Sequence, residues 1–404
     1  MLKGSIFAFA IAGIFAAGNS VCTAAEYGPG ADDHEIKIGN TMPYSGPASG
    51  YSAIGKSLSA YFAMINDQGG INGRKINFIS RDDGYSPPKT VEQVRQLVEQ
   101  DQVLLTFNLL GTPPNTAVQG YLNDNKVPQL FVATGADHWG DYKQFPWTIG
   151  YQPSYQVEAR IYAKYILQNK PNAKIGILYQ DDAFGKDYLI GLKEGLGAKA
   201  STMLVATQTY TTSEPTVDSQ IVSLKGSGAD TLVIAAIPKF AAQSIRKVAQ
   251  LGWKPLFFMT NVSISVASVM KPAGLENGVG IITGEYGKDP TDPAFKNDAD
   301  MKEWLTWVKK WDPAADPIDV NAVYGYGLAH VMVQVLKQCG NDFSRENIMK
   351  QATHLNYTPP MLLSGITVST SPTDYHPIKQ MQLARFNGKT WVRFGPIISG
   401  AAGS

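Results

Sequence analysis

The stretch IKIGNTMPYSGPASGYSAIGKSLSAYFAMINDQGGINGRKINFIS, residues 36–80, decides the fold. It opens with the apolar run Ile36 to Met42 and ends with a second run, Ile76 to Ser80. Between the runs, apolar side chains recur at the three- and four-residue spacing of one helical face, at Tyr51, Ile54, Leu58, Tyr61, Phe62 and Ile65. A strand, an amphipathic helix and a second strand form the repeating unit of parallel sheets, with right-handed crossovers.

The same alternation continues along the chain. Helical spacing recurs at Val91, Val94, Leu97 and Val98, and further apolar runs follow at 103–108, 129–133, 175–179, 203–207, 231–237 and 256–260. Continuous apolar strands separated by helices require a parallel sheet covered on both faces. We therefore predict a three-layer α/β architecture. The pattern pauses over the aromatic, Gly- and Pro-bearing segment 138–153 and then resumes, which indicates a crossing into a second domain.

The last third of the chain departs from this alternation. A strand is expected at 279–283, long helices at 295–311 and 317–338, and short strands at 365–368, 379–386 and 390–394. Asn387-Gly388 between the last two strands is a strong hairpin signal. Periodicity alone leaves open which domain each of these late pieces joins.

Composition sets outer limits on function. The 404 residues carry 35 Lys+Arg against 34 Asp+Glu, with 44% hydrophobic residues, as expected for an ordinary globular chain of about two domains. Near-zero net charge argues against a nucleic-acid partner, because that affinity needs clustered Lys and Arg. Two cysteines exclude a disulfide-rich scaffold and a four-thiolate zinc site. Cys339 follows an apolar helical run and is expected to be a buried small hydrophobe.

The N-terminus is typical of a secretory signal. Lys3 precedes the apolar run Ile6 to Ala17, and small residues lead to a cleavage point after Ala25. We predict that residues 1–25 are removed and that the mature protein diffuses freely. A membrane anchor or a buried N-terminal helix is the alternative, although the run is short for a bilayer span. Lipidation at Cys22 is another, although the Leu-like residue of lipoprotein signals is missing three positions earlier.

The glycine motifs that could indicate nucleotide binding lie within predicted helices and not in loops. Residues 50–57, GYSAIGKS, satisfy the letters of a phosphate-binding P-loop, but Tyr51, Ile54 and Leu58 continue a helical face through the supposed loop. A small-residue helix packed on a sheet explains the segment better. Gly325-Tyr326-Gly327 lies within a helical run and indicates close packing.

Residues for catalysis or metal binding are also lacking. The chain has no HExxH, CxxC or GxSxG, and its five histidines lack metal-ligand spacing. Asp182 and Asp82-Asp83 follow predicted strands, where carboxylates cap helices and shape turns. We therefore expect no catalytic residues, no metal and no cofactor.

The ends of the predicted strands suggest a ligand site. Open α/β sheets bind ligands at the carboxyl ends of their strands, where helix N-termini present free N–H groups that suit an anion. Gly111-Thr112 after the third strand, and Ala133, Thr134, Gly135 and Ala136 after the fourth, combine small residues with hydroxyl donors. Plain strand-to-helix turns would have the same residues.

Several sequence blocks match a known family. They are Ile36-Lys37-Ile38-Gly39, Ser45-Gly46-Pro47, Asp82-Asp83, Ala163-Lys164-Tyr165-Ile166, Phe184-Gly185-Lys186-Asp187-Tyr188 and, most specifically, Ile65-Asn66-Asp67-Gln68-Gly69-Gly70-Ile71-Asn72-Gly73-Arg74. With the signal peptide, the chain resembles the periplasmic binding proteins of branched-chain amino-acid type ABC transporters over nearly its whole mature length. The resemblance implies a monomeric, two-lobed type I binding protein in the periplasm. It would have three hinge crossings, close around one small molecule and deliver it to the permease subunits in the membrane.

The resemblance also implies lobe boundaries and binding residues. The first lobe would take 36–150 and 284–362, and the second 151–283 and 363–404. In the family's amino-acid binders, the ligand carboxylate is held after the third strand, here Thr112, and after the fourth, here Ala133 and Gly135, where Thr134 can replace a missing hydroxyl. Gly111 stands where the family commonly has a cysteine of a first-lobe disulfide.

The second lobe departs from the amino-acid binders. The acid that holds a ligand ammonium corresponds to Asn261, and Ile237 replaces a polar aromatic. A buried ammonium without its carboxylate costs several kcal/mol, so we expect a ligand without one. The candidate binding residues are Ser45, Tyr51, Leu110, Gly111, Thr112, Ala133, Thr134, Gly135, Ala136, Tyr155, Phe184, Ile237 and Asn261.

A small carboxylate with an aromatic body would suit these candidates. The segments Gly-Thr-Pro-Pro-Asn (111–115) and Ala-Thr-Gly-Ala-Asp-His-Trp (133–139) look like those of family members that take up benzoate or cinnamate derivatives. Each aromatic candidate could instead be a core residue. A branched-chain or other amino-acid binder, a periplasmic enzyme and a sensory ligand-binding protein remain alternatives.

Overall fold

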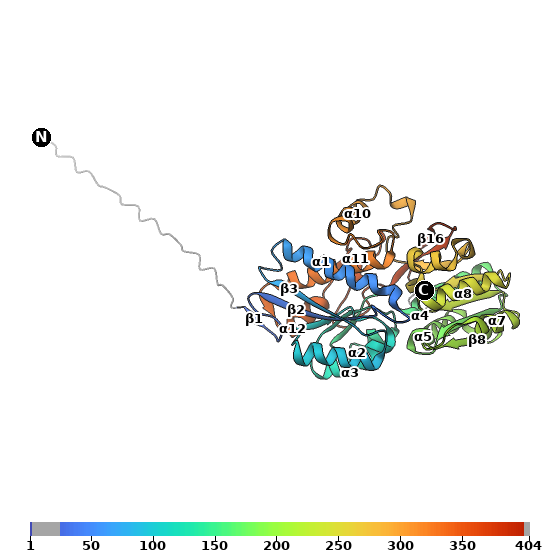
Figure 1. The fold of residues 1–404 in the computed structure, drawn as a ribbon, viewed down its shortest axis with the longest axis horizontal. Helices are drawn as coiled ribbons and strands as arrows, with labels where there is room; N and C mark the ends of the chain where they lie inside the picture. Colours follow the sequence, from blue (N-terminus) through green and yellow to red (C-terminus); the bar gives the residue numbers. More distant parts are fainter. Residues whose placement is uncertain (2–24, 400–404) are drawn as a thin grey trace.

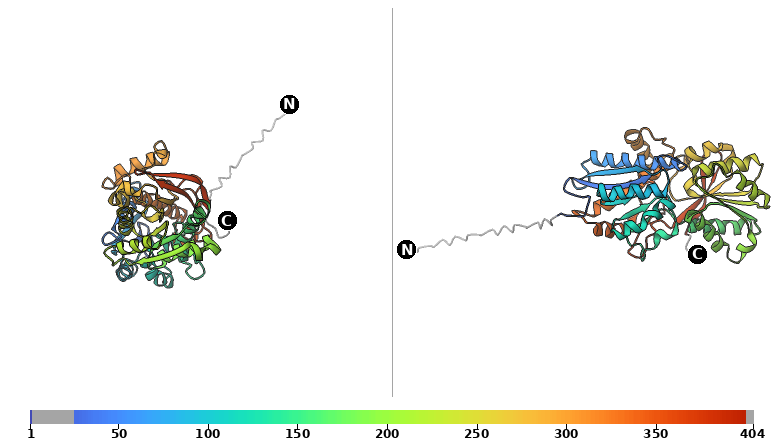
Figure 2. Two further views of the ribbon diagram at one scale, coloured as in Figure 1. Left: turned by 90° about the vertical axis from the view of Figure 1, so that its right-hand side faces the viewer. Right: turned by 60° about the horizontal axis from the view of Figure 1, so that its bottom comes forward.

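The computed structural model describes Met1 and residues 25–399. The predicted signal peptide, apart from Met1 and Ala25, lies outside the described residues, and so does Cys22. The described chain forms two α/β lobes side by side (Figure 1), each with its own sheet. Figure 2 separates them most clearly in its right-hand view, where blue and cyan elements form one lobe and green and yellow elements the other.

The first sheet is entirely parallel, in the order β3-β2-β4-β5-β6. Helices α1 and α11 lie together on one side, and α2 and α3 on the other (Figure 1). The elements are β2 (Glu35–Met42), α1 (Ser52–Asp67), β3 (Lys75–Asp82), α2 (Pro87–Arg95), β4 (Leu105–Phe107), α3 (Thr112–Asp124), β5 (Gln129–Val132) and β6 (Thr148–Gly150). The strand–helix–strand unit predicted for residues 36–80 is present.

The second sheet is mixed, in the order β16-β15-β11-β10-β9-β7-β8. Its strands β7 to β11 are parallel, while β15 and β16 add an antiparallel hairpin at one edge. The elements are α4 (Tyr155–Asn169), β7 (Ile175–Gln180), α5 (Ala183–Leu196), α6 (Ala200–Met203), β8 (Leu204–Tyr210), α7 (Asp218–Gly226), β9 (Thr231–Ala235), α8 (Pro238–Gln250), β10 (Leu256–Met259), α9 (Lys271–Ala273), β11 (Ile282–Glu285), β15 (Gln380–Phe386) and β16 (Trp391–Ser399).

The chain passes between the two sheets three times: after β6, after β11 and before β15. Between the last two crossings, α11 packs along α1 of the first lobe. This segment contains α10 (Ala299–Trp311), α11 (Val320–Gln338), β12 (Asp342–Phe343, paired with β1, Glu26–Tyr27), α12 (Arg345–Ala352), β13 (Asn356–Tyr357) and β14 (Val368–Ser369). Short 3-10 or π turns occupy 49–51, 96–100, 137–140, 197–199, 261–263, 266–270, 275–278 and 293–295.

Three late predictions needed adjustment. The helix expected from 295 begins at Ala299, because the Asp298 carboxylate accepts a hydrogen bond from the Met301 N–H at 3.1 Å and caps it there. The helix expected from 317 begins after Asp319, which caps it in the same way. The strand expected at 365–368 is reduced to β14, which follows Gly365 in a left-handed conformation and pairs only with β13 among the described strands.

The structure explains the glycine and cysteine motifs by packing. Residues 52–57 of the P-loop look-alike form the first turns of α1, and Lys56 is exposed. A Cβ on Gly325 would stand 2.6 Å from the Ile54 carbonyl oxygen, so this glycine allows α11 to approach α1. Cys339 is buried and unpaired, as expected.

The predicted capping carboxylates have those roles. Asp182 accepts a hydrogen bond from Gly185 N–H at the start of α5, and Asp83 accepts one from Tyr85 N–H in the turn after β3. The Asp82 carboxylate accepts hydrogen bonds from Ser45 and Gly84; these outweigh burial and lower its pKa to about 2. Among residues 25–399, no His, Cys, Asp and Glu cluster could hold a metal, and no helix is long and apolar enough to cross a membrane.

Candidate functional site

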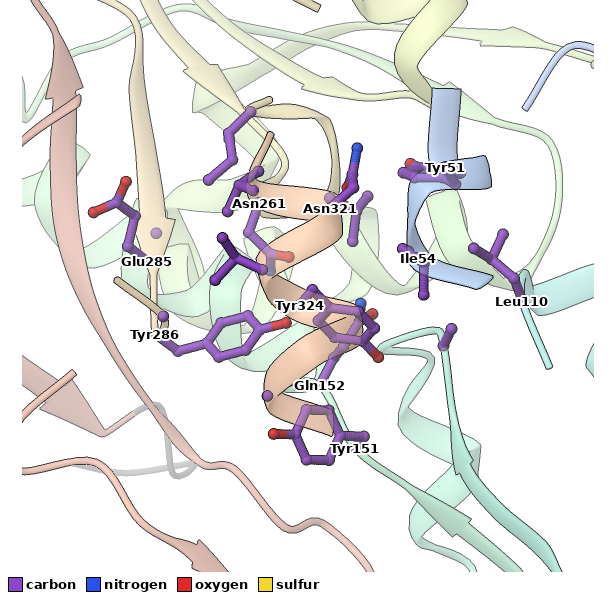
Figure 3. A pocket seen from close by; sticks show the side chains of 18 of the residues that line it. Tyr51, Ile54, Leu110, Tyr151, Gln152, Asn261, Glu285, Tyr286, Asn321 and Tyr324 are labelled. Atoms are coloured by element: carbon purple, nitrogen blue, oxygen red, sulfur yellow. The ribbon is translucent and has the colours of Figure 1, made fainter. Parts of the chain in front are cut away.

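A cavity of about 1040 Å³, including the solvent-filled part of its mouth, lies at the carboxyl ends of strands from both sheets. Its walls come from the ends of β4, β5 and β6 on one side and of β9, β10 and β11 on the other. The beginnings of α1 and α11 complete it (Figure 3). This is the position at which open α/β sheets bind ligands.

Nine of the thirteen predicted binding residues line this cavity: Tyr51, Leu110, Gly111, Thr112, Ala133, Tyr155, Phe184, Ile237 and Asn261. The other four lie elsewhere. Ser45 is exposed, and its hydroxyl donates to Asp82. Thr134 and Ala136 are buried behind the wall. A Cβ on Gly135 would stand 2.5 Å from the Pro153 carbonyl oxygen, which explains why the usual threonine is absent there.

Two threonine hydroxyls meet at the first-lobe wall. The Oγ1 atoms of Thr112 and Thr134 are 2.5 Å apart, and both residues are buried. Burial raises the pKa of Tyr155 and outweighs the neighbouring Thr134 hydroxyl and Gly135 main chain, which lower it. Tyr155 therefore stays a neutral phenol, and the wall presents hydroxyl groups.

The main chain at this wall supplies fewer donors than expected. Helix α3 begins at Thr112 and continues with Pro113 and Pro114, which have no N–H. The Gly111 N–H already donates to the Ala133 carbonyl at 3.2 Å. The expectation of a row of free main-chain N–H groups is therefore wrong for this helix, and hydroxyls are the main donors.

Aromatic side chains dominate the remaining wall. Tyr155 packs on Phe184, with ring centroids 4.8 Å apart, and Tyr151 packs on Tyr324 at 5.8 Å. Figure 3 shows Tyr151, Tyr324 and Tyr286 around the same space, although they come from different elements. Sequence reasoning missed Tyr85, Tyr151, Tyr286 and Tyr324. Of these four, only Tyr85 could have been found from the sequence, because it directly follows the Asp82-Asp83-Gly84 turn after a predicted strand.

Charged residues of the second crossing also line the cavity, and sequence reasoning missed them. The Lys288 ammonium donates to Asp298 at 2.8 Å and to Asp300 at 2.7 Å, so its charge is compensated within the protein. Glu285 and Asp289 are buried, and each has one carboxyl oxygen without a partner among the described residues. Burial raises the pKa of Asp289 to about 6 and raises the pKa of Glu285 well above its usual value. In Figure 3, Glu285 points away from Tyr286, to the other side of β11.

A buried carboxylate lies directly behind Asn261. The Glu158 carboxyl accepts hydrogen bonds from the Asn261 N–H at 2.8 Å, from the Tyr188 hydroxyl at 2.6 Å, and from the Tyr162 hydroxyl and the Asn261 side-chain amide. Glu158 is fully buried, and this raises its pKa to about 7 although all four donors favour the charged form. Sequence reasoning missed Glu158, because a single glutamate in an amphipathic helix normally faces water.

Hydrogen bonds close the cleft between the lobes. The Gln180 side-chain amide donates to the Tyr85 hydroxyl at 3.3 Å, and the Ser265 hydroxyl donates to Asp319 at 2.9 Å. Gln180 ends β7 and Ser265 follows β10, both of the second sheet, whereas Tyr85 follows β3 and Asp319 precedes α11, both of the first lobe. The structure is therefore a closed form with the cavity between its lobes.

Fold, crossings and an interlobe cavity together define a binding protein of the type I, two-lobed class. The family model described as periplasmic binding protein matches residues 35–390, and the chain belongs to this family. Among curated proteins, Leu/Ile/Val-binding protein homolog 1 of Brucella suis is 24% identical over 319 residues, covering 77% of this chain and 81% of that protein.

Two solved structures illustrate the range of ligands within the fold. A branched-chain amino acid ABC transporter protein from Thermus thermophilus with bound valine has a TM-score of 0.83 at 14% identity, covering 92% of this chain and 98% of that one. A solute binding protein of an ABC transporter from R. palustris in complex with benzoate has a TM-score of 0.75 at 20% identity, covering 91% and 98%. At these identities, the similarity shows the fold alone.

Proposed function

We propose that this periplasmic binding protein of Leu/Ile/Val-binding type serves an ABC importer. It works as a monomer in the periplasm, closes by hinge motion around a small carboxylate with an aromatic body, and delivers it to the permease subunits. In this proposal the first lobe comprises residues 36–150 and 284–362, and the second lobe comprises residues 151–283 and 363–404. The packing of α11 on α1 supports the assignment of that helix to the first lobe. The pairings of β11 with β15 and of β14 with β13 favour a second crossing after Glu285 and a third after Ser369, later than the boundaries at 284 and 363.

The observation that carries the ligand class is the composition of the cavity wall. Aromatic rings including Tyr155, Phe184 and Tyr324 surround the space, and Ile237 adds an aliphatic surface. Such a wall favours a flat apolar body. The Thr112 and Tyr155 hydroxyls at the first-lobe wall are suitable donors for a carboxylate. Lys288, a cation of the lining, already forms ion pairs with two aspartates.

Solute binding without turnover is the expected activity. A thermal-shift panel of benzoate, hydroxybenzoates, cinnamates, aliphatic diacids, leucine, glutamate and urea tests the ligand class. A ligand at about a thousand times its Kd should add roughly 4 kcal/mol of stability. A shift with leucine and none with any aromatic acid would refute the aromatic class. Recovery of the ligand unchanged after incubation distinguishes binding from catalysis.

An amino-acid ligand is the second candidate, and a specific observation favours it. Asp289 keeps a buried carboxyl oxygen without a partner among the described residues, and it belongs to the cavity lining. An ammonium beside this oxygen would gain a charge-assisted hydrogen bond. Asp289→Asn should then abolish leucine binding, whereas an aromatic acid should retain its affinity in this variant.

A further inference from the structure

The Asn261 side chain has a fixed orientation at the cavity wall. Its amide nitrogen donates to one Glu158 carboxyl oxygen, and its main-chain N–H donates to the other at 2.8 Å. These two contacts come from the same residue to the same carboxylate, so they hold the amide plane. The amide nitrogen therefore faces away from the cavity, and the Oδ1 oxygen is the end left for a ligand.

The oxygen of this amide is an unused acceptor. Within residues 25–399, no protein group donates to Asn261 Oδ1, and the residue, with 8% of its surface exposed, lines the cavity. A ligand that fills the cavity takes water away from the Asn261 oxygen, so a ligand that donates to this oxygen is favoured over one that does not.

Glu158 is held in place from several elements. It lies on α4, and its donors come from Tyr162 on the same helix, Tyr188 on α5 and Asn261 after β10. The Tyr162 hydroxyl also lies 2.7 Å from the Met259 carbonyl, and the Tyr188 hydroxyl lies 2.6 Å from Thr260 Oγ1. Tyr162 and Tyr188 are buried with raised pKa values, so they remain neutral donors at every pH used below.

From this geometry we propose that Glu158 is a positioning residue that turns the Asn261 oxygen toward the cavity and so makes the site select carboxylic acids bearing a hydroxyl group. The donor of such a ligand would meet Asn261 in the second lobe while its carboxylate meets the Thr112 side. This inference rests on the proposed function, because it assumes an aromatic acid in the cavity.

The protonation state of Glu158 controls the orientation of the amide. When the carboxyl is charged, it can only accept, and the amide nitrogen must face it. When it is protonated, it can donate to Asn261 Oδ1, and the amide can turn its nitrogen toward the cavity. Because the pKa of Glu158 is raised by burial to about 7, this change falls within an accessible pH range.

Benzoate and 4-hydroxybenzoate are the probes, because they differ only in the added hydroxyl. Calorimetric titration of the mature protein at pH 8.5 should give a Kd for 4-hydroxybenzoate about 5- to 20-fold below that for benzoate. The ratio should change between pH 8.5 and pH 5.5, because the turned amide then offers the ligand hydroxyl a donor in place of an acceptor, a result that needs no variant. Glu158→Gln should remove both the preference and its pH dependence while benzoate still binds. Glu276→Gln, an exposed control, should leave both unchanged.

Each other outcome contradicts either the positioning role of Glu158 or the proposed aromatic ligand class. Equal affinities for the two acids in the wild-type protein, or a preference that survives in Glu158→Gln, would refute the positioning role and leave the proposed function standing. If neither acid binds, the proposed aromatic class fails, and the selection of hydroxylated acids fails with it. If Glu158→Gln does not fold, the wild-type pH series still decides: a constant ratio between pH 5.5 and 8.5 contradicts the inference.

Discussion

The Ser265 hydroxyl donates a hydrogen bond to the Asp319 carboxylate across the two lobes, with Oγ and Oδ1 2.9 Å apart. Both residues are buried, and Asp319 also caps α11. The contact exists only while the lobes are together. It therefore belongs to the free-energy difference between the closed and open forms, to which ligand affinity is coupled.

Removing this contact should weaken binding. Ser265→Ala should raise the Kd of the tightest-binding panel compound about tenfold, because a hydrogen bond to a charged group contributes about 1.5 to 3 kcal/mol and part is regained from water. Ser201→Ala, on an exposed serine, is the control. Ser265 also caps a turn through the Ser268 N–H, so the melting temperature of the ligand-free variant must be measured as well. Unchanged affinity would show that the contact does not stabilise closure.

The Thr112 hydroxyl can be tested with a substitution of nearly equal volume. Thr112→Val should weaken a carboxylate ligand by about 1.5 to 3 kcal/mol, because a donor to a buried charge is lost. Thr116→Val is a matched control one turn later on α3, where the hydroxyl bonds only to the Thr112 carbonyl and weakly to His138. Isothermal titration calorimetry measures both. Equal affinities in the two variants would remove Thr112 from the binding site.

Stability should fall as pH rises from about 4 to about 7. Burial raises the pKa of Asp187 and of Asp289 to about 6 and that of Glu158 to about 7, whereas unfolded carboxyls titrate near 4. Between these values the folded protein binds more protons than the unfolded chain, so deprotonation favours unfolding. Urea unfolding at pH 5, 6, 7 and 8 measures the slope.

A single variant tests whether Asp289 contributes to that pH dependence. Asp289→Asn removes one buried titrating group and should raise the free energy of unfolding at pH 8 by about 1 to 3 kcal/mol. The exposed Asp124→Asn should change it little. If Asp289→Asn leaves both the stability at pH 8 and the slope as in the wild type, Asp289 is already ionised at little cost.

Packing of α1 on α11 can be tested at Gly325, with a glycine of α3 as the control. Gly325→Ala should destabilise the fold by about 1 to 3 kcal/mol, because the new Cβ would stand 2.6 Å from the Ile54 carbonyl oxygen. Gly120 is the matched control: it also lies within a helix, but nothing is within 4 Å of its Cβ position, so Gly120→Ala should stabilise by about 0.5 to 1 kcal/mol. Chemical unfolding of both variants should give shifts of opposite sign.

The regular part of the fold was predictable because buried parallel strands leave continuous apolar runs. β2, β7 and β10 begin or end within one residue of their expected bounds. The late strands could not be placed, since β15 pairs with β11, about a hundred residues earlier, and brings β16 with it, and no local pattern encodes a distant partner.

The candidate site was predictable where it follows the ends of strands. Thr112 follows the apolar run 103–108 by four residues, Asn261 was identified from the resemblance to the amino-acid binders, and both line the cavity. Tyr286 and Glu285 could not be found, because the crossing after β11 has no periodicity. Glu158 was missed for a different reason: its role depends on Tyr188 and Asn261, which only the folded chain brings together.

The most direct test of the central claim is calorimetric titration of the ligand-free mature protein with 4-hydroxybenzoate, benzoate and leucine under identical conditions. We expect saturable one-to-one binding of both aromatic acids, with compaction on binding visible by small-angle X-ray scattering, and no binding of leucine. Binding of leucine alone would contradict the account, since the cavity would then hold an ammonium whose charge the neutral Asn261 amide cannot compensate.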